Sequence, residues 1–452
     1  MNRTATTRTS PIAHSRAARS RAVLSRAALA CLAALSWSAA QAADVTITAD
    51  RLLDVRTGRM VQNPEILVRD GRIVSVKPGA AASAAPAAAA PGDGTRIALP
   101  GMTLVPGLID MHVHLDSDPT YGGYSYLEYN DRFWSALAVA HAGKTLDAGF
   151  TTVRNVGASD WNDVGLSQAI AAGKVRGPRI VPAAWSFGAT GGHCDSTYFP
   201  PSMEQKNPYV ADGPEEVRKS VRALRKYGAQ VIKVCATGGV FSRNTEPGQQ
   251  QMNYAELRAA VEEAAQWGLK VAAHAHGAAG IKDAIRAGVT TIEHASLIDD
   301  EGIALAKKHG AFLSMDIYNG DYTAAEGKKN GVLEDNLRKD REVTEIQRQN
   351  FKKAHAAGVK MVFGTDAGVH PHGNNGKQFA VMVKYGMSPL QAIQAATINA
   401  AEALGRNDVG IVEAGRYGDM VAVQGDPTAN VQLLEAPAVV IQGGTVVKRN
   451  AP

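Results

Sequence analysis

The feature that most constrains the fold is an alternation of short apolar segments with helical segments through most of the chain. The apolar segments predict strands, and the stretches between them place apolar residues at three- and four-residue spacing, which is typical of helices. Eight candidate strands result, at 104–113, 150–156, 179–184, 230–236, 270–275, 290–293, 311–315 and 360–364. Eight βα units close a barrel, so we predict an α/β protein with a (β/α)8 TIM barrel. A doubly wound sheet is the alternative, but the chain offers no glycine-rich phosphate-binding turn for it.

Helices are predicted between or after these strands, at 214–227, 254–267, 279–287, 299–309, 337–357 and 389–404. Several of them end in a glycine just before the next strand, as at Gly228 and Gly288.

The two ends of the chain have a different character from its middle. Short β-branched segments occur at 44–49, 65–69 and 72–76, and again at 420–423, 438–441 and 445–448. We therefore predict a small β-sandwich domain made from 43–104 and 406–452, with the barrel at 105–405. The glycine-, alanine- and proline-rich stretch 79–94 cannot pack a core and is predicted to be a loop or a flexible insertion.

Residues 1–42 have the pattern of a secretory signal. They contain six arginines and no acidic residue, an apolar run at 27–35 and a small-residue cleavage site ending at Ala42. We expect export to the periplasm or the medium, and no later stretch is apolar enough to predict a membrane span. These six arginines exceed the whole formal charge of +5, so the rest of the chain gives no electrostatic support for a nucleic-acid partner.

Of the three cysteines, Cys194 and Cys235 remain after the predicted cleavage. A disulfide is possible in an oxidising compartment, but both cysteines fall within the predicted barrel, and we expect two thiols.

Histidine pairs at the ends of predicted strands indicate a metal site. His112 and His114 close the first strand, and because side chains alternate they share one face, roughly 6.6 Å apart. His274 and His276 stand in the same relation on the fifth strand. Two hydrogen-bonded core histidines are the alternative for any single pair.

Lys233 lies inside the fourth predicted strand among apolar residues, where an unpaired ammonium would be costly. Either a carboxylate compensates its charge, or the amine has reacted with carbon dioxide to give a carbamate that bridges two metal ions. His294 and Asp366 end the sixth and eighth strands, at the barrel face where active sites are built, so we favour the metal-ligand interpretation.

These residues carry a resemblance. Residues 105–114, Lys233, His274, His294 and 364–366, in this order, resemble the binuclear metal hydrolases of the amidohydrolase superfamily. Residues 190–193, 236–240, 273–277, 292–295 and 364–373 are similar to its prolidase-like, imidazolonepropionase-related branch. That branch contains Xaa-Pro and other dipeptidases, and exported enzymes that cleave the amide of ochratoxin A.

The resemblance implies a ligand set and a mechanism. His112, His114 and Asp366 would hold one zinc, His274 and His294 a second, and carboxylated Lys233 would bridge the two Zn²⁺ ions. Water between such ions has a pKa of about 7, which gives hydroxide at neutral pH. Asp366 would orient this nucleophile, take its proton and pass it to the leaving amine.

Candidate substrate groups are His193, Arg243, Tyr318 and His276. His193 could stabilise the tetrahedral oxyanion, or make a loop hydrogen bond. Arg243 could bind a substrate carboxylate, although an exposed loop arginine is equally common. Tyr318 is a substrate-binding candidate with the same alternative as Arg243. His276 could contact substrate or support a metal ligand.

We therefore predict an exported binuclear zinc amidohydrolase that cleaves dipeptides or N-acyl amino acids, small molecules that include ochratoxin A as a candidate, and that forms a homo-oligomer by resemblance. A deaminase, a cyclic-amide hydrolase or a lactonase on the same barrel is the enzymatic alternative. Many deaminases of the superfamily place an acid three residues after the fifth-strand histidine, where this chain has Gly277. A metal-free binding module is the non-enzymatic alternative.

Overall fold

The structure is a computed structural model that describes residues 44–79 and 94–450. The predicted signal at 1–42 and residues 80–93 of the predicted loop lie outside the described residues.

Both ends of the described chain build one eight-stranded sheet. From the N-terminal side come β1 (Val45–Asp54), β2 (Arg59–Gln62), β3 (Pro64–Arg69), β4 (Arg72–Pro78) and β5 (Thr95–Pro106). From the C-terminal side come β14 (Met420–Gln424), β15 (Val439–Gln442) and β16 (Thr445–Arg449). The strand order is β16-β15-β14-β5-β1-β3-β4, with β2 paired to β1, and Met420 lies opposite Pro106 where β14 meets β5. Residues that lie opposite one another on neighbouring strands, such as Ile47, Ile66 and Ile97, form its core.

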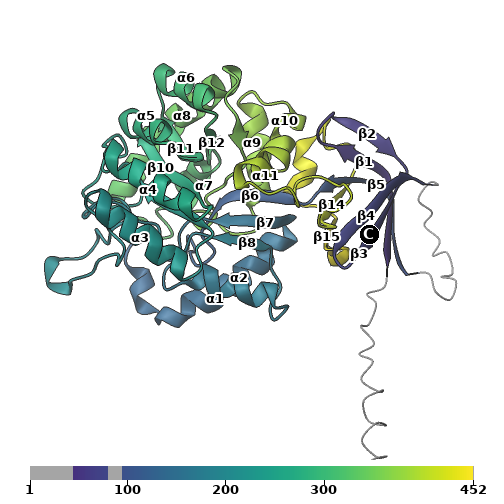
Figure 1. The fold of residues 1–452 in the computed structure, drawn as a ribbon, viewed down its shortest axis with the longest axis horizontal. Helices are drawn as coiled ribbons and strands as arrows, with labels where there is room; N and C mark the ends of the chain where they lie inside the picture. The colour runs from purple at the N-terminus through teal and green to yellow at the C-terminus, as the bar shows by residue number, and fades with distance from the viewer. Residues whose placement is uncertain (1–43, 80–93, 451–452) are drawn as a thin grey trace, which may run out of the picture. The chain divides into compact units, whose positions relative to one another are not determined.

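The middle of the chain forms two parallel sheets with helices beside them (Figure 1). One contains β6 (Leu108–Val113), β7 (Phe150–Asn155) and β8 (Arg179–Pro182). The other contains β9 (Val231–Cys235), β10 (Lys270–Gly277), β11 (Thr291–Leu297), β12 (Phe312–Ser314) and β13 (Met361–Val362). Each of these eight strands lies at a position predicted from the sequence.

Backbone contacts join the two parallel sheets at both of their edges. Phe187, beyond β8, makes an isolated parallel bridge with Val234 of β9. Met111 of β6 donates its N–H to the carbonyl of Phe363, just after β13, at 2.8 Å. The strand ends that carry the candidate site residues are thereby linked on both sides.

The prediction of one strand over 104–113 is wrong, because the chain breaks at Gly107. Pro106 ends β5 and has no N–H to continue the ladder. A Cβ at position 107 would lie 2.2 Å from Oγ1 of Thr151, so the turn between the two sheets requires glycine. β5 therefore belongs to the end sheet and β6 to the central one.

The helices are α1 (Asp131–Asp147), α2 (Asn162–Ala171), α3 (Pro214–Lys226), α4 (Tyr254–Gln266), α5 (Ala278–Ala287), α6 (Asp300–His309), α7 (Asn319–Glu326), α8 (Glu334–Ala356), α9 (Gln378–Lys384), α10 (Pro389–Ala395) and α11 (Ile398–Leu404). One prediction is wrong, since the expected helix at 389–404 is two helices. Thr397 interrupts it with φ −135° and ψ −94°, and its hydroxyl donates to the carbonyl of Ile393 at 2.7 Å.

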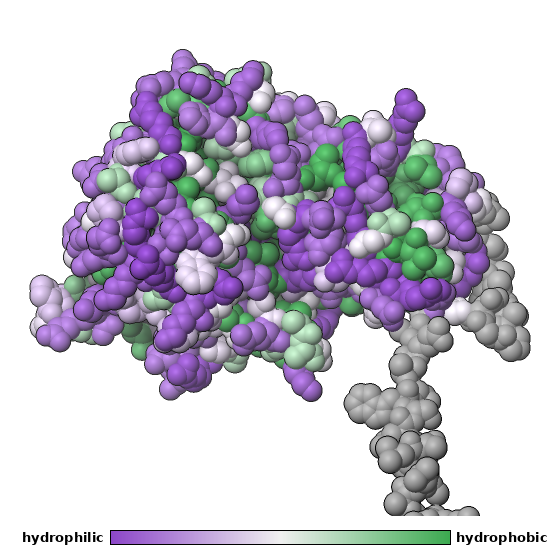
Figure 2. Space-filling model, in the orientation of Figure 1, coloured by the Kyte–Doolittle hydropathy of each residue, from purple (hydrophilic) through white to green (hydrophobic). Residues whose placement is uncertain are grey.

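The expectation of two thiols is also wrong, because Cys194 and Cys235 form a disulfide with their Cα atoms 5.9 Å apart. The bond joins the loop after β8 to the end of β9. Hydrophilic side chains cover most of the face drawn in Figure 2. Among the described residues, no helix has the length and apolar character needed to cross a membrane.

Candidate metal centre

His112 and His114 converge with Asp366 at the end of β6. The Nε2 atoms of both histidines lie 3.3 Å from Oδ1 of Asp366. Ligand atoms that share one tetrahedral ion at about 2.0–2.2 Å are separated by about 3.4 Å, so each of the two nitrogens is spaced from Asp366 as two ligands of one cation would be.

The other nitrogen of each ring is engaged by an acceptor. Nδ1 of His112 lies 3.0 Å from a carboxylate oxygen of Glu293, and Nδ1 of His114 lies 2.9 Å from the carbonyl of Gly157. Each Nδ1 therefore donates, which leaves the Nε2 lone pair directed to the centre.

His274 and His294 repeat this arrangement on β10 and β11. Nε2 of His274 lies 3.1 Å from the carbonyl of Gly238, and Nδ1 of His294 lies 2.9 Å from Oδ1 of Asp316. Nδ1 of His274 and Nε2 of His294 are left as lone-pair donors. Ligand atoms of His112, His294 and Asp366 lie within 4.8 Å of one another, as do those of His274, His276 and His294. This donor set can bind metal.

Lys233 lies on β9 beside these ligands and is 3% exposed. Within residues 44–79 and 94–450, its Nζ makes no hydrogen bond and no ion pair within 4.0 Å. Burial lowers the pKa of the amine to about 8. A buried amine without a partner is costly as an ammonium, and the neutral form is the one that reacts with carbon dioxide.

Buried acidic groups around the histidines favour a cation. Burial and Lys233 oppose a charge on His112, yet Asp366 and Glu293 raise the pKa of His112 above its usual value. Burial also opposes the charge of Glu293, but Arg154 and His112 hold the pKa of that carboxyl well below its usual range. Glu293 is therefore ionised, with Arg154 donating to it at 2.7 Å.

Asp366 is fixed by contacts from several elements. Its N–H donates to the carbonyl of His112 at 2.8 Å, and Asn319 donates to its Oδ2 at 3.3 Å. Burial would raise the pKa of Asp366, but His112 and His114 hold it well below its usual range, so the group is a carboxylate at neutral pH. Both Asp366 and His294 have positive φ, 57° and 68°, which marks backbone strain at the site.

Asp110 ties β6 to the segment that carries Asp366. Its Oδ1 accepts from the N–H groups of His112 and Thr365, and its Oδ2 from the Thr365 hydroxyl and from Asn375. Burial raises the pKa of this carboxyl to about 6. Asp110 thereby fixes the position of His112 relative to Asp366.

His193 lies against the centre, with its ring centroid 4.0 Å from that of His274 in a stacked geometry. Its Nδ1 is 2.9 Å from the hydroxyl oxygen of Ser242. Burial, followed by the charge of His294, lowers the pKa of His193 to about 3, so the ring is neutral.

The remaining predicted residues are placed differently. His276 is buried, stacks on His294 at 4.7 Å, and has Nδ1 2.8 Å from the Ser296 hydroxyl oxygen. Arg243 is exposed and donates to the Tyr124 hydroxyl at 3.0 Å. Tyr318 is half-buried with its ring 5.1 Å from that of His370. Of the three, the structure brings only His276 into the histidine cluster.

Sequence reasoning missed the groups that orient the ligands: Asp110, Arg154, Ser242, Glu293, Asp316 and Asn319. A signal existed for two of them. Arg154 is a charged residue inside an apolar strand, like Lys233, and Asp316 follows the seventh strand as Asp366 follows the eighth.

Comparisons with known proteins identify the family of the chain. The sequence model of the amidohydrolase family matches residues 103–447. Ochratoxinase of Aspergillus niger is 32% identical over 375 residues, which cover 76% of this chain and 75% of that protein.

Solved structures extend the likeness. A Xaa-Pro dipeptidase with bound methionine in its active site matches with a TM-score of 0.82 and 35% identity, over 89% of this chain and 99% of that one. A prolidase complexed with N-methylphosphonate-L-proline matches with a TM-score of 0.80 and 29% identity, over 90% of this chain and 100% of that one. The chain thus belongs to the amidohydrolase family and is a hydrolase that acts on amide bonds.

Proposed function

We propose that the protein is an exported binuclear zinc hydrolase that cleaves the amide bond of dipeptides or N-acyl amino acids. One observation carries the proposal. Four histidines each have one ring nitrogen engaged by an acceptor and the other directed to a common centre, beside Asp366 and the buried amine of Lys233.

Two ions would be held by this donor set. Nε2 of His112, Nε2 of His114 and Asp366 would hold one ion, and Nδ1 of His274 with Nε2 of His294 would hold the other. Lys233 lies on the strand next to His274 and would bridge the sites as a carbamate, which suits its lack of a partner and its lowered pKa. The ions would supply Lewis-acid polarisation of the scissile carbonyl and a lowered pKa for water.

The side chains would manage the proton and the developing charge. Asp366 is ionised and can accept a proton from the attacking water and deliver it to the leaving nitrogen. His193 is neutral, and if the Ser242 hydroxyl donates to Nδ1, the opposite N–H is available to a tetrahedral oxyanion.

The proposal also includes a closed barrel and export of the protein. The backbone contacts at both edges of the central sheets support a closed (β/α)8 barrel. Export rests on the pattern of residues 1–42, and a disulfide between Cys194 and Cys235 suits an oxidising compartment.

The names of the relatives guide the substrate test. Xaa-Pro, Xaa-Phe, Xaa-Arg and N-acyl amino acids, with ochratoxin A among them, should be assayed with added zinc and bicarbonate, and release of the free amino acid measured. We expect release from at least one class. Deamination of nucleobases without release of any amino acid would overturn the proposal.

A deaminase that carries an acid three residues after the fifth-strand histidine is disfavoured by packing. A Cβ at Gly277 would lie 2.3 Å from the carbonyl oxygen of Gly248, so no larger residue fits at that position. Metal analysis tests the metal-free alternative, since less than one zinc ion per chain after purification would favour a binding module.

A further inference from the structure

We propose that a pocket beside the metal centre binds an aromatic ring in the acyl half of the substrate. The aromatic pocket, as we call it, has a volume of about 240 Å³ and is walled by the apolar and aromatic side chains of Tyr198, Phe241, Tyr322, Val332 and Val369. This inference rests on the proposed function and names the substrate class of the same site.

The pocket adjoins the residues assigned to catalysis. Gly368 lines it, and a Cβ at this position would lie 2.9 Å from the carbonyl oxygen of His114. Phe241 also lines it, two residues after Gly239, where an added Cβ would lie 2.3 Å from ring atoms of His193. A substrate whose amide lies at the metal centre can therefore extend one substituent into the pocket.

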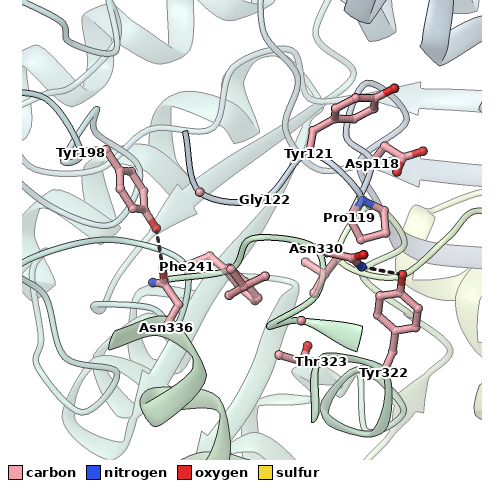
Figure 3. Close-up of a pocket in the computed structure, with 15 residues that line it drawn as sticks. Asp118, Pro119, Tyr121, Gly122, Tyr198, Phe241, Tyr322, Thr323, Asn330 and Asn336 are labelled. Atoms are coloured by element: carbon pink, nitrogen blue, oxygen red, sulfur yellow. Dashed lines mark hydrogen bonds between the residues drawn. The ribbon is translucent and has the colours of Figure 1, made fainter. Parts of the chain in front are cut away.

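The tyrosine hydroxyls of the wall are already paired. Figure 3 shows the Tyr198 hydroxyl donating to Asn336 at 3.2 Å and Asn330 donating to the Tyr322 oxygen at 3.0 Å. These bonds leave the rings as the available surface, and aromatic groups prefer offset or edge-to-face contact with other rings. The volume also fits, because a cavity of about 150 Å³ lined by apolar groups binds benzene.

The charge of the wall selects the acyl half. Among the described residues that line the pocket, Asp118 is the only charged one. Burial opposes its charge, but hydrogen bonds with His141 and Thr120 hold its pKa well below the usual range, so it is a carboxylate. The amino acid released from a dipeptide or N-acyl amino acid carries a free carboxylate, which Asp118 would repel. The acyl half has no such group.

Two matched substrates test the pocket. The ratio of kcat/KM for the N-benzoyl and N-acetyl derivatives of one amino acid should exceed one in the wild type. It should fall about tenfold or more in Val332→Trp, which fills the pocket, and also in Phe241→Leu, which removes a ring. Tyr254→Ala removes an exposed aromatic residue on α4 and should leave the ratio within about twofold.

A binding measurement separates this inference from the proposed function. Saturation-transfer NMR should detect benzamide on the wild type but not on Val332→Trp, with acetamide as the control probe and thermal unfolding to check that each variant is folded. If benzamide binds but no amide is hydrolysed, the inference about the pocket holds and the proposed function is overturned. No benzamide signal on the wild type, or an unchanged signal or substrate ratio in the folded variants, would overturn the pocket.

Discussion

At the residue scale, Asp366 is the group on which the proposed mechanism depends most. An amide at this position keeps the shape of the side chain but cannot accept the proton of the attacking water. We expect Asp366→Asn to lower kcat by about 10³-fold while the midpoint of thermal unfolding stays close to that of the wild type. The variant should be assayed after zinc loading with its metal content measured. Near-normal turnover in a metal-loaded sample would contradict the assignment of this proton transfer.

The sequence predicts the histidines and the lysine that gather at this centre better than it predicts the groups that orient them. His112 and His114 are readable because strand alternation places both on one face, and Lys233 because a lysine in an apolar strand needs an explanation. Glu293, which orients His112, is 181 residues away along the chain. Such a partner becomes visible only when the fold brings side chains of β6 and β11 together.

At the element scale, the loop after β9 and the start of α8 position His193. Lys339, which is fully buried on α8, donates to the carbonyl of Ser242 at 2.7 Å, and Asn336 donates to that of Val240 at 2.5 Å. These bonds fix the Ser242 hydroxyl beside His193. The spacing of apolar residues predicts most of α8. It cannot show that the start of this helix forms hydrogen bonds with the loop after β9.

Gly239 in this loop gives a test of that positioning. A Cβ there would lie 2.3 Å from ring atoms of His193, so Gly239→Ala should displace the ring and lower kcat about tenfold or more, with zinc content unchanged. Gly248→Ala is the matched control, since its Cβ would meet only Leu297 at 3.7 Å. Equal kcat values for the two variants would show that the ring position does not matter for turnover.

Element boundaries were less predictable than element positions. The break at Gly107 comes from a contact with a residue distant in sequence, and the interruption at Thr397 coincides with a side-chain bond to a backbone carbonyl one turn earlier; neither changes the apolar pattern of its segment. A larger residue at Gly107 would clash with Thr151 on the neighbouring strand β7. The hydroxyl of Thr397 donates to the carbonyl of Ile393. The composition of these segments is otherwise that of a continuous strand and a continuous helix.

At the scale of the whole molecule, the centre draws strands from both parallel sheets. His112 is on β6, Lys233 on β9, His274 on β10 and His294 on β11, while Asp366 follows β13. Ions that bind these side chains only in the folded state must stabilise the fold by mass action. The buried carboxylates Glu293, Asp316 and Asp366 also repel one another less when cations lie among them.

Removal of metal should therefore lower the thermal stability of the entire chain. An ion at a hundredfold excess over its Kd contributes about 2.7 kcal/mol, so chelation should lower Tm by several degrees, and zinc with bicarbonate should restore it. The matched variant is Lys233→Met, which retains the histidines but cannot form the carbamate, and its recovery of Tm should not depend on bicarbonate. Identical Tm values before and after verified zinc removal would show that the histidine cluster does not hold ions that stabilise the fold.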